Sequence, residues 1–179
     1  MRVIAGEAKG RRLKMVPGSS TRPVGGRVKE ALFGILGEWV VDALFLDLYA
    51  GTGSVGIEAL SRGARAAVFV DQGRRAIATI KDNLAHTGLD DRARVVRADV
   101  FAFMKRGDLE PFDLIYVAPP QYKGLWAKTL RALDGSSLLA PGGLVVAQIH
   151  PKEYQALRLE TLSLTEQRRY GSTVLCFYS

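Results

Sequence analysis

Short apolar segments alternate with amphipathic helices along most of this chain, and that alternation restricts the fold more than any other feature. Five segments have the length and apolar content of buried strands: Ala43–Ala50, Ala66–Val70, Arg94–Arg97, Phe112–Val117 and Gly143–Ile149. The helical spacing of apolar residues predicts helices between them, at Ser54–Arg62, Arg74–Thr87 and Leu125–Leu133. Strands that alternate with helices in this way predict an α/β fold with a doubly wound, mostly parallel sheet.

Two further segments extend this core. Apolar residues at helical spacing predict a helix that starts at Arg27, and the segments Leu157–Arg168 and Thr173–Tyr178 predict a C-terminal antiparallel hairpin around Tyr170 and Gly171. A chain of 179 residues is long enough for one domain with a buried core. We therefore expect residues 27–179 to form the domain and residues 1–26 to precede it as an arm.

The charge of the chain is concentrated at its N-terminus. Residues 1–29 hold eight basic side chains and one acid, so this segment carries the whole net charge of +7. Its glycines and prolines argue against one helix and favour a short hairpin followed by a loop. A basic segment beside a neutral domain is typical of proteins that bind a polyanion, although a solvated tail would have the same composition.

A glycine-rich turn follows the first predicted strand. Gly51, Gly53 and Gly56 fit the pattern G-x-G-x-x-G, and Asp71 closes the second strand 20 residues after Gly51. Glycines allow the backbone to approach a ligand closely, and a carboxylate about 20 residues further along the chain can accept hydrogen bonds from ribose hydroxyls. The pattern predicts a cofactor that contains adenosine. A tight turn with a surface acid is the simpler alternative.

Acidic residues at three successive strand ends favour a cationic cofactor. Asp47 lies four residues before Gly51, where a carboxylate would repel the pyrophosphate of NAD but would suit an amino group and a sulfonium. Asp99 ends the third strand, where it could accept from an adenine amine, or could instead cap the helix that follows. Together, the three acids favour S-adenosylmethionine over NAD.

The fourth strand ends in a segment that could position a planar base. Ala118, Pro119, Pro120, Gln121 and Tyr122 combine a rigid backbone with an aromatic ring. Backbone carbonyls there could accept from an exocyclic amine while the ring stacks on the base. An ordinary proline loop with a packing tyrosine is the alternative.

Composition excludes several other classes of protein. Cys176 is the only cysteine, so no internal disulfide can form, and one cysteine with two histidines is too few for a structural zinc site. No apolar run approaches the ~20 residues of a membrane helix. We expect a cytoplasmic, monomeric protein that needs no metal and contacts no membrane.

Several stretches resemble the RsmD-type family, bacterial methyltransferases that modify a guanine N2 of 16S ribosomal RNA. The similar stretches are residues 2–6, 9–13, 21–23, 27–33, 46–63, 69–71 and 170–171. The resemblance implies a class I, Rossmann-like methyltransferase fold that uses S-adenosylmethionine. It implies that the substrate is ribosomal RNA, within the small subunit or an assembly intermediate.

The resemblance also implies roles for particular residues. The residues expected to bind the cofactor are Asp47, Tyr49, Ala50, Gly51, Gly53, Asp71 and Asp99. From the charge of the N-terminal segment, we expect Lys9, Arg11, Arg12, Lys14, Arg22 and Arg27 to bind RNA phosphates. The catalytic segment is Ala118–Tyr122, with Tyr122 stacking on the base.

One departure from the family leaves the activity open. The family's usual catalytic sequence is Asp-Pro-Pro-Tyr/Phe, whereas this chain has Ala118 in place of the acid and Gln121 before the aromatic residue. Gln121 could substitute as a hydrogen-bond acceptor. A catalytically impaired RNA-binding homologue remains one alternative, and a NAD-dependent oxidoreductase remains another.

Overall fold

The computed structural model describes residues 1–19 and 23–179. Its strands are β1 (Leu44–Leu48), β2 (Ala66–Asp71), β3 (Ala93–Arg97), β4 (Phe112–Val117), β5 (Leu139–Ile149), β6 (Leu164–Tyr170) and β7 (Thr173–Tyr178). Its helices are α1 (Gly26–Leu36), α2 (Ser54–Ser61), α3 (Arg74–Thr87), α4 (Val100–Met104) and α5 (Leu125–Leu133). Three 3-10 turns, η1 (Gly37–Val40), η2 (Asp90–Arg92) and η3 (Pro151–Glu153), complete the elements of the described residues.

The strands form one sheet in the order β3-β2-β1-β4-β5-β7-β6. Neighbouring strands from β3 to β5 pair in parallel, whereas β7 pairs antiparallel with both β5 and β6. The predicted α/β fold with a C-terminal antiparallel hairpin is therefore confirmed. The strand order reverses between β1 and β4, which makes their carboxyl ends the expected place for a ligand.

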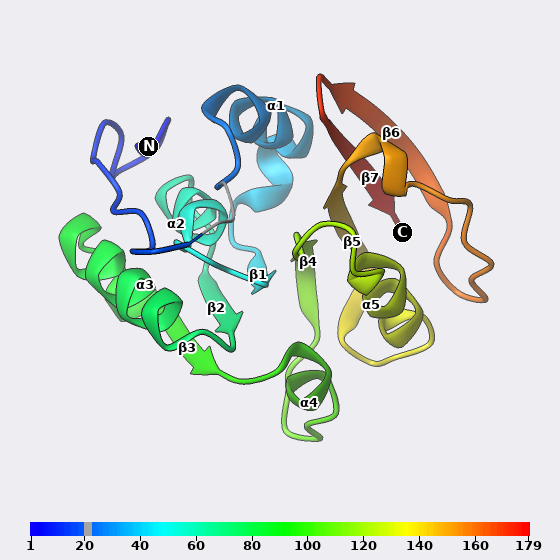
Figure 1. Cartoon of the computed structure of the whole chain (residues 1–179). Helices are drawn as coiled ribbons and strands as arrows, with labels where there is room; N and C mark the ends of the chain where they lie inside the picture. The colour runs from blue at the N-terminus through cyan, green and yellow to red at the C-terminus, as the bar shows by residue number, and fades with distance from the viewer. Residues whose placement is uncertain (20–22) are drawn as a thin grey trace.

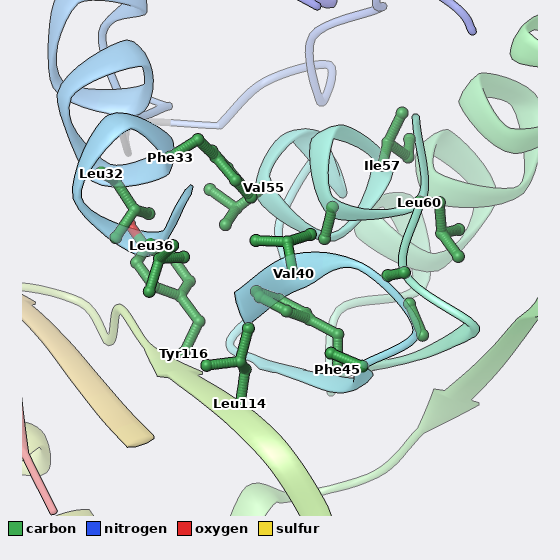
Figure 2. Close-up of a cluster of buried hydrophobic side chains, with 14 of the residues drawn as sticks. Leu32, Phe33, Leu36, Val40, Phe45, Val55, Ile57, Leu60, Leu114 and Tyr116 are labelled. Carbon is green, nitrogen blue, oxygen red and sulfur yellow. The ribbon is translucent and has the colours of Figure 1, made fainter. Parts of the chain in front are cut away.

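Helices cover both faces of this sheet (Figure 1). One apolar cluster joins the sheet to α1, α2 and α3, and a second joins the opposite face to α4 and α5. Figure 2 shows part of the first cluster, in which side chains of β1 and β4 meet residues of the helices above them; it labels Leu32, Phe33, Leu36, Val40, Phe45, Val55, Ile57, Leu60, Leu114 and Tyr116. Burial on both faces explains why the central strands β1 and β4 are mostly apolar, with Asp47 and Asp113 as their acidic residues.

Local signals set the ends of the helices near the site. Gly53 has a φ of 79° and lies directly before α2, and Gly88 has a φ of 70° and ends α3 as predicted. Both angles lie in the left-handed region, which glycine adopts without a steric cost. The chain therefore turns sharply from β1 into α2.

The N-terminal segment packs against the domain. Arg2 and Arg12 form an antiparallel bridge, and Val3, Ala8 and Leu13 are buried in the first apolar cluster. The hydroxyl of Ser61 in α2 accepts a hydrogen bond from the backbone N–H of Ala8. Apolar contacts and backbone hydrogen bonds thus hold the segment on α2.

Two predicted boundaries are wrong. We expected the fifth strand to begin at Gly143, but β5 begins at Leu139, and its register with β4 shifts between Phe112 and Leu114. The predicted strand from Leu157 begins only at Leu164. The residues before this strand are held instead by the carboxylate of Asp134, which accepts hydrogen bonds from the backbone N–H groups of Glu160, Thr161 and Leu162. Both differences come from contacts between distant segments.

None of the helices in residues 1–19 and 23–179 combines the length and apolar character needed to cross a membrane.

Candidate functional site

A cavity of about 860 Å³ opens at the carboxyl ends of the parallel strands. The segments that follow β1, β2, β3 and β4 contribute to its wall, as does the end of β5. Parts of the N-terminal segment, among them Met15, Val16 and Val24, close another side. The cavity therefore lies where the strand order reverses, and its volume is within the range of small-molecule and cofactor sites.

Most of the predicted cofactor residues meet in this cavity. Asp47, Tyr49, Ala50, Gly51, Asp71 and Asp99 all line it. Gly53 does not, although its left-handed backbone is needed for the turn into α2. A Cβ atom at Gly56 would lie 2.4 Å from the ring of Phe69, so glycine here lets α2 pack closely on β2. The three glycines of the pattern thus have different functions.

Asp71 ties the end of β2 to the glycine turn. Its Oδ2 atom accepts from the backbone N–H of Gly51 at 2.9 Å, and its Oδ1 atom accepts from the N–H of Gly73 at 2.8 Å. A carboxylate has about four acceptor positions, so both oxygens can accept further hydrogen bonds. The side chain is half-buried and borders the cavity. It can therefore hold the turn and bind hydroxyl groups of a ligand at the same time.

Asp47 is a buried acid at the bottom of the cavity. Its side chain is 1% exposed, and its Oδ2 atom accepts from the N–H of Gly56 at 3.0 Å. Burial raises the pKa of Asp47 to about 8, the Gly56 hydrogen bond opposes that rise, and the charge of Asp71 adds to it. A cation in the cavity would stabilise the ionised carboxylate. This environment suits a positively charged ligand.

Asp99 caps a helix and also borders the cavity. Its Oδ1 atom accepts from the backbone N–H groups of Phe101 at 3.0 Å and Ala102 at 3.1 Å, at the start of α4. The helix-cap alternative that the sequence left open is therefore present in the structure. Because Asp99 lines the cavity, capping does not exclude a contact with a ligand.

The whole Ala118–Tyr122 segment lines the same cavity as the glycine turn. Tyr122 is 63% exposed and has a φ of 61°, a left-handed conformation that bulky residues rarely adopt. Its backbone N–H donates to Oε1 of Glu153 at 2.6 Å, and its ring lies 5.6 Å from the ring of His150. These contacts hold an exposed aromatic ring at the cavity mouth.

No acid replaces the missing one at Ala118. Among the described residues, the acids that line the cavity are Asp47, Asp71 and Asp99. Between Ala118 and Gln121, the hydrogen-bond acceptors that the segment itself offers are its backbone carbonyls and the exposed side-chain amide of Gln121.

Five of the six predicted RNA-binding residues lie outside the cavity. Lys9, Arg11, Arg12, Lys14 and Arg27 are exposed and do not line it, and Arg22 lies outside the described residues. Lys14 pairs with Asp82 of α3 at 3.3 Å, and an Arg11 N–H group donates to the His86 carbonyl at 3.4 Å. The exposed cations thus form a surface that is separate from the cavity wall.

Sequence reasoning missed two polar pairs near the site. Tyr116 on β4 donates its hydroxyl hydrogen to Oε1 of Gln148 on β5, and both residues line the cavity. Lys29 was counted among the N-terminal cations, yet it is buried against Glu58. A polar residue within the apolar strand at Gly143–Ile149 was the available signal for Gln148.

Comparison with known proteins gives a consistent set of relatives. A family model described as Conserved hypothetical protein 95 matches residues 1–179. The chain is 38% identical over 183 residues to "Putative rRNA methyltransferase YlbH" of Bacillus subtilis (strain 168), covering 99% of this chain and 98% of that protein. It is 34% identical over 148 residues to "Ribosomal RNA small subunit methyltransferase D" of Escherichia coli (strain K12), covering 83% of this chain and 74% of that protein.

A solved structure shares the complete fold. The structure described as "Putative methyltransferase yhhF from Escherichia coli" superposes with a TM-score of 0.89 at 32% identity, covering 99% of this chain and 96% of that chain.

Proposed function

The chain belongs to the family of the ribosomal RNA small subunit methyltransferase D proteins, which its family model describes as Conserved hypothetical protein 95, and on that premise we propose that it is an S-adenosylmethionine-dependent methyltransferase that acts on a guanine N2 of 16S ribosomal RNA. One observation carries the proposal. A single cavity brings the glycine turn, with Asp47 and Asp71, together with the Ala118–Tyr122 segment. A cofactor and a base could therefore meet within it.

The donor side of the cavity fits S-adenosylmethionine. When bound, this cofactor supplies a methyl group activated by a positively charged sulfonium. Asp71 would accept hydrogen bonds from the ribose hydroxyls, because its oxygens keep acceptor positions beyond those used by Gly51 and Gly73. Asp47 would face the cationic part of the ligand, since its burial leaves few other ways to stabilise its charge. Tyr49, Ala50 and Asp99 complete this side.

The acceptor side would hold the base. Tyr122 would stack on a base turned out of the RNA, because its ring is exposed at the cavity mouth and supported by His150. The backbone carbonyls near Ala118 and Pro119 and the Gln121 side chain would accept hydrogen bonds from the exocyclic amine. These bonds would turn the nitrogen lone pair toward the methyl group. The enzyme's contribution would be orientation of two reactants.

The exposed N-terminal cations would bind the RNA backbone. Lys9, Arg11, Arg12, Lys14 and Arg27 are accessible, so each can approach a phosphate. We include Arg22 on the sequence pattern alone. The substrate would be RNA in the small subunit or an assembly intermediate, and the enzyme would work in the cytoplasm as a monomer.

The decisive experiment measures the modification in ribosomal RNA. We expect small-subunit RNA from a strain that lacks this protein to lose one N2-methylguanine in nucleoside mass spectrometry, and the purified protein to restore it with S-adenosylmethionine. A complete set of methylated guanines in that strain would refute the proposal.

Ala118 supports a second candidate, a homologue that binds RNA but has lost catalysis. Losing one transition-state hydrogen bond typically costs about 10²–10³ in rate. Transfer of labelled methyl groups to unmethylated small subunits separates the two candidates, because an inactive homologue would bind the subunits and transfer no label. Family membership and the acid at Asp47 argue against the NAD-dependent oxidoreductase.

A further inference from the structure

Gln148 is a polar side chain at the end of a buried strand, and one neighbour fixes its orientation. The Tyr116 hydroxyl donates to the Oε1 atom of Gln148. Burial and the nearby Asp47 raise the pKa of Tyr116 well above its usual value, so its hydroxyl keeps the hydrogen that it donates. Figure 2 shows Tyr116 extending from β4 toward α1 among apolar side chains. The phenol therefore has little freedom to turn away.

This hydrogen bond determines which end of the amide is available. An amide has one acceptor oxygen and a nitrogen with two donor hydrogens. The oxygen of Gln148 is engaged with Tyr116, and within residues 1–19 and 23–179 its nitrogen donates to no protein atom. Gln148 is half-buried and lines the cavity. The cavity wall therefore presents two amide donors at the end of β5.

The donors lie beside the proposed base site. β4 and β5 are parallel, and Val117 pairs with Ala147, so Ala118 and Gln148 are the next residues on neighbouring strands. Neighbouring strands lie about 4.7–4.9 Å apart. Residues paired in a parallel sheet point to the same face, which places Ala118, Gln148 and Tyr116 on one face. A base whose amine meets the end of β4 could thus extend the rest of its Watson–Crick edge toward the end of β5.

We propose that Gln148 is a specificity-determining residue that donates a hydrogen bond to a carbonyl oxygen on the Watson–Crick edge of the target base. The inference rests on the proposed function and adds the group that recognises the base. Guanine carries the amine on C2 and an oxygen on C6 of the same edge. Adenine carries an amine at C6, which is a donor and would leave the Gln148 hydrogens without an acceptor. Unpaired polar groups of this kind exclude the wrong substrate strongly.

A substitution in the RNA and one in the protein test this pairing together. One substrate is unmethylated small-subunit RNA with guanine at the target nucleotide. The other is the same RNA with 2-aminopurine at that nucleotide, a base that keeps the C2 amine and lacks the C6 oxygen. We expect the wild-type kcat/KM for guanine RNA to exceed that for 2-aminopurine RNA by about 10- to 100-fold. Gln148→Met should lose a similar factor on guanine RNA and no longer distinguish the two RNAs.

Two controls exclude a structural explanation. Gln148→Met should bind S-adenosylmethionine with wild-type affinity, and Gln167→Met, the same change at an exposed position on β6, should keep the wild-type preference. Tyr116→Phe should weaken the preference for guanine RNA, because the Gln148 amide would no longer be held in one orientation. In a Gln148→Met background, Tyr116→Phe should cause no further loss of that preference.

The outcomes separate this inference from the proposed function. If wild-type protein methylates guanine RNA and Gln148→Met retains the full preference over 2-aminopurine RNA, the inference is overturned while the function stands. If wild-type protein methylates neither RNA at the target nucleotide, the proposed function fails and the inference falls with it.

Discussion

The side-chain nitrogen of Lys29 lies 3.3 Å from Oε2 of Glu58, and the two side chains are 1% and 0% exposed. Lys29 also donates to the Arg2 carbonyl and to the Ser54 hydroxyl, and Glu58 accepts from the backbone N–H of Ile4. Ser54 begins α2 and lines the cavity. One buried ion pair therefore connects the N-terminal segment, α1 and the cofactor side of the site.

Breaking this pair should destabilise the protein strongly. Glu58→Gln leaves Lys29 buried without its counter-charge, and we expect the free energy of unfolding to fall by about 3–5 kcal/mol near neutral pH. Burial already lowers the pKa of Lys29, and loss of Glu58 removes the main contribution that raises it. The cost should therefore shrink as pH rises and Lys29 loses its proton. Urea denaturation across the alkaline range measures this, with Glu30→Gln on the exposed side of α1 as the control.

Asp71→Ala should weaken cofactor binding. The change removes the proposed charged acceptor for the ribose hydroxyls, and hydrogen bonds to charged groups contribute about 1.5–3 kcal/mol, so affinity for S-adenosylmethionine should fall roughly 10- to 100-fold. Isothermal calorimetry measures the affinity. Asp82→Ala, an exposed acid on α3, is the matched control. Unchanged affinity in a folded Asp71→Ala protein would remove Asp71 from the site.

Asp47 should make the stability of the cofactor-free protein depend on pH. Its pKa is raised from 3.8 to about 8, so the folded protein retains a proton that the unfolded chain releases. The folded state therefore loses stability as pH rises from about 4 to about 8, and Asp47→Asn should flatten that decline. Urea unfolding at intervals across this range tests the prediction. The exposed Asp42→Asn should retain the wild-type slope, and a wild-type slope in Asp47→Asn would contradict the assignment.

The N-terminal cations should affect RNA binding and leave cofactor binding unchanged. Replacing Lys9, Arg11, Arg12 and Lys14 by alanine removes up to four ion pairs with RNA phosphates. The slope of log affinity against log salt should become shallower by about 0.7–0.9 for each phosphate that is no longer neutralised. Filter binding to small-subunit RNA at several salt concentrations gives the slope. The control is the double variant Lys105→Ala with Arg131→Ala, which removes two cations near α4 and on α5 and should leave this slope almost unchanged. An unaltered slope in the fourfold variant would make the segment a solvated tail.

Gln121 should substitute in part for the acid absent at Ala118. Gln121→Ala should lower turnover by about 10²-fold without affecting cofactor affinity, as expected for a bond formed mainly in the transition state. Ala118→Asp in that background should recover activity, because a carboxylate is a stronger acceptor. Nearby acids would raise the pKa of the new carboxyl, so the recovery should increase with pH.

Single-turnover assays on under-methylated small subunits at several pH values measure both effects. Gln155→Ala, an exposed glutamine outside the cavity wall, is the control. Full activity in Gln121→Ala would show that the backbone around Pro119 and Pro120 suffices to position the amine.

Local patterns predicted the parts of the fold and site that depend on neighbouring residues. Buried strands produced recognisable apolar runs, and the turn after β1 was visible because Gly51 and Gly53 need left-handed backbone angles. The strand ends at Asp47, Asp71 and Ala118 then coincided because parallel strands finish at one edge of the sheet.

Contacts between distant segments escaped prediction. The Tyr116–Gln148 bond depends on the register of β4 with β5, which no short sequence window contains. Lys29 resembled the exposed cations around it, and only the position of Glu58, 29 residues later in the chain, explains its burial. The predicted strand Gly143–Ile149 began four residues too late, because Pro141, Gly142 and Gly143 usually signal a turn, whereas here they lie within β5, whose pairing with β4 is irregular.

Tyr49 and Tyr122 both have a φ of 61°, and both border the cavity. A bulky residue in this conformation costs about 1–3 kcal/mol, and glycine would adopt it freely. On backbone conformation alone, glycine would therefore be the less strained residue at both positions. Attempts to raise the thermal stability of the protein should start at other positions, because changes at Tyr49 and Tyr122 would also alter the wall of the cavity.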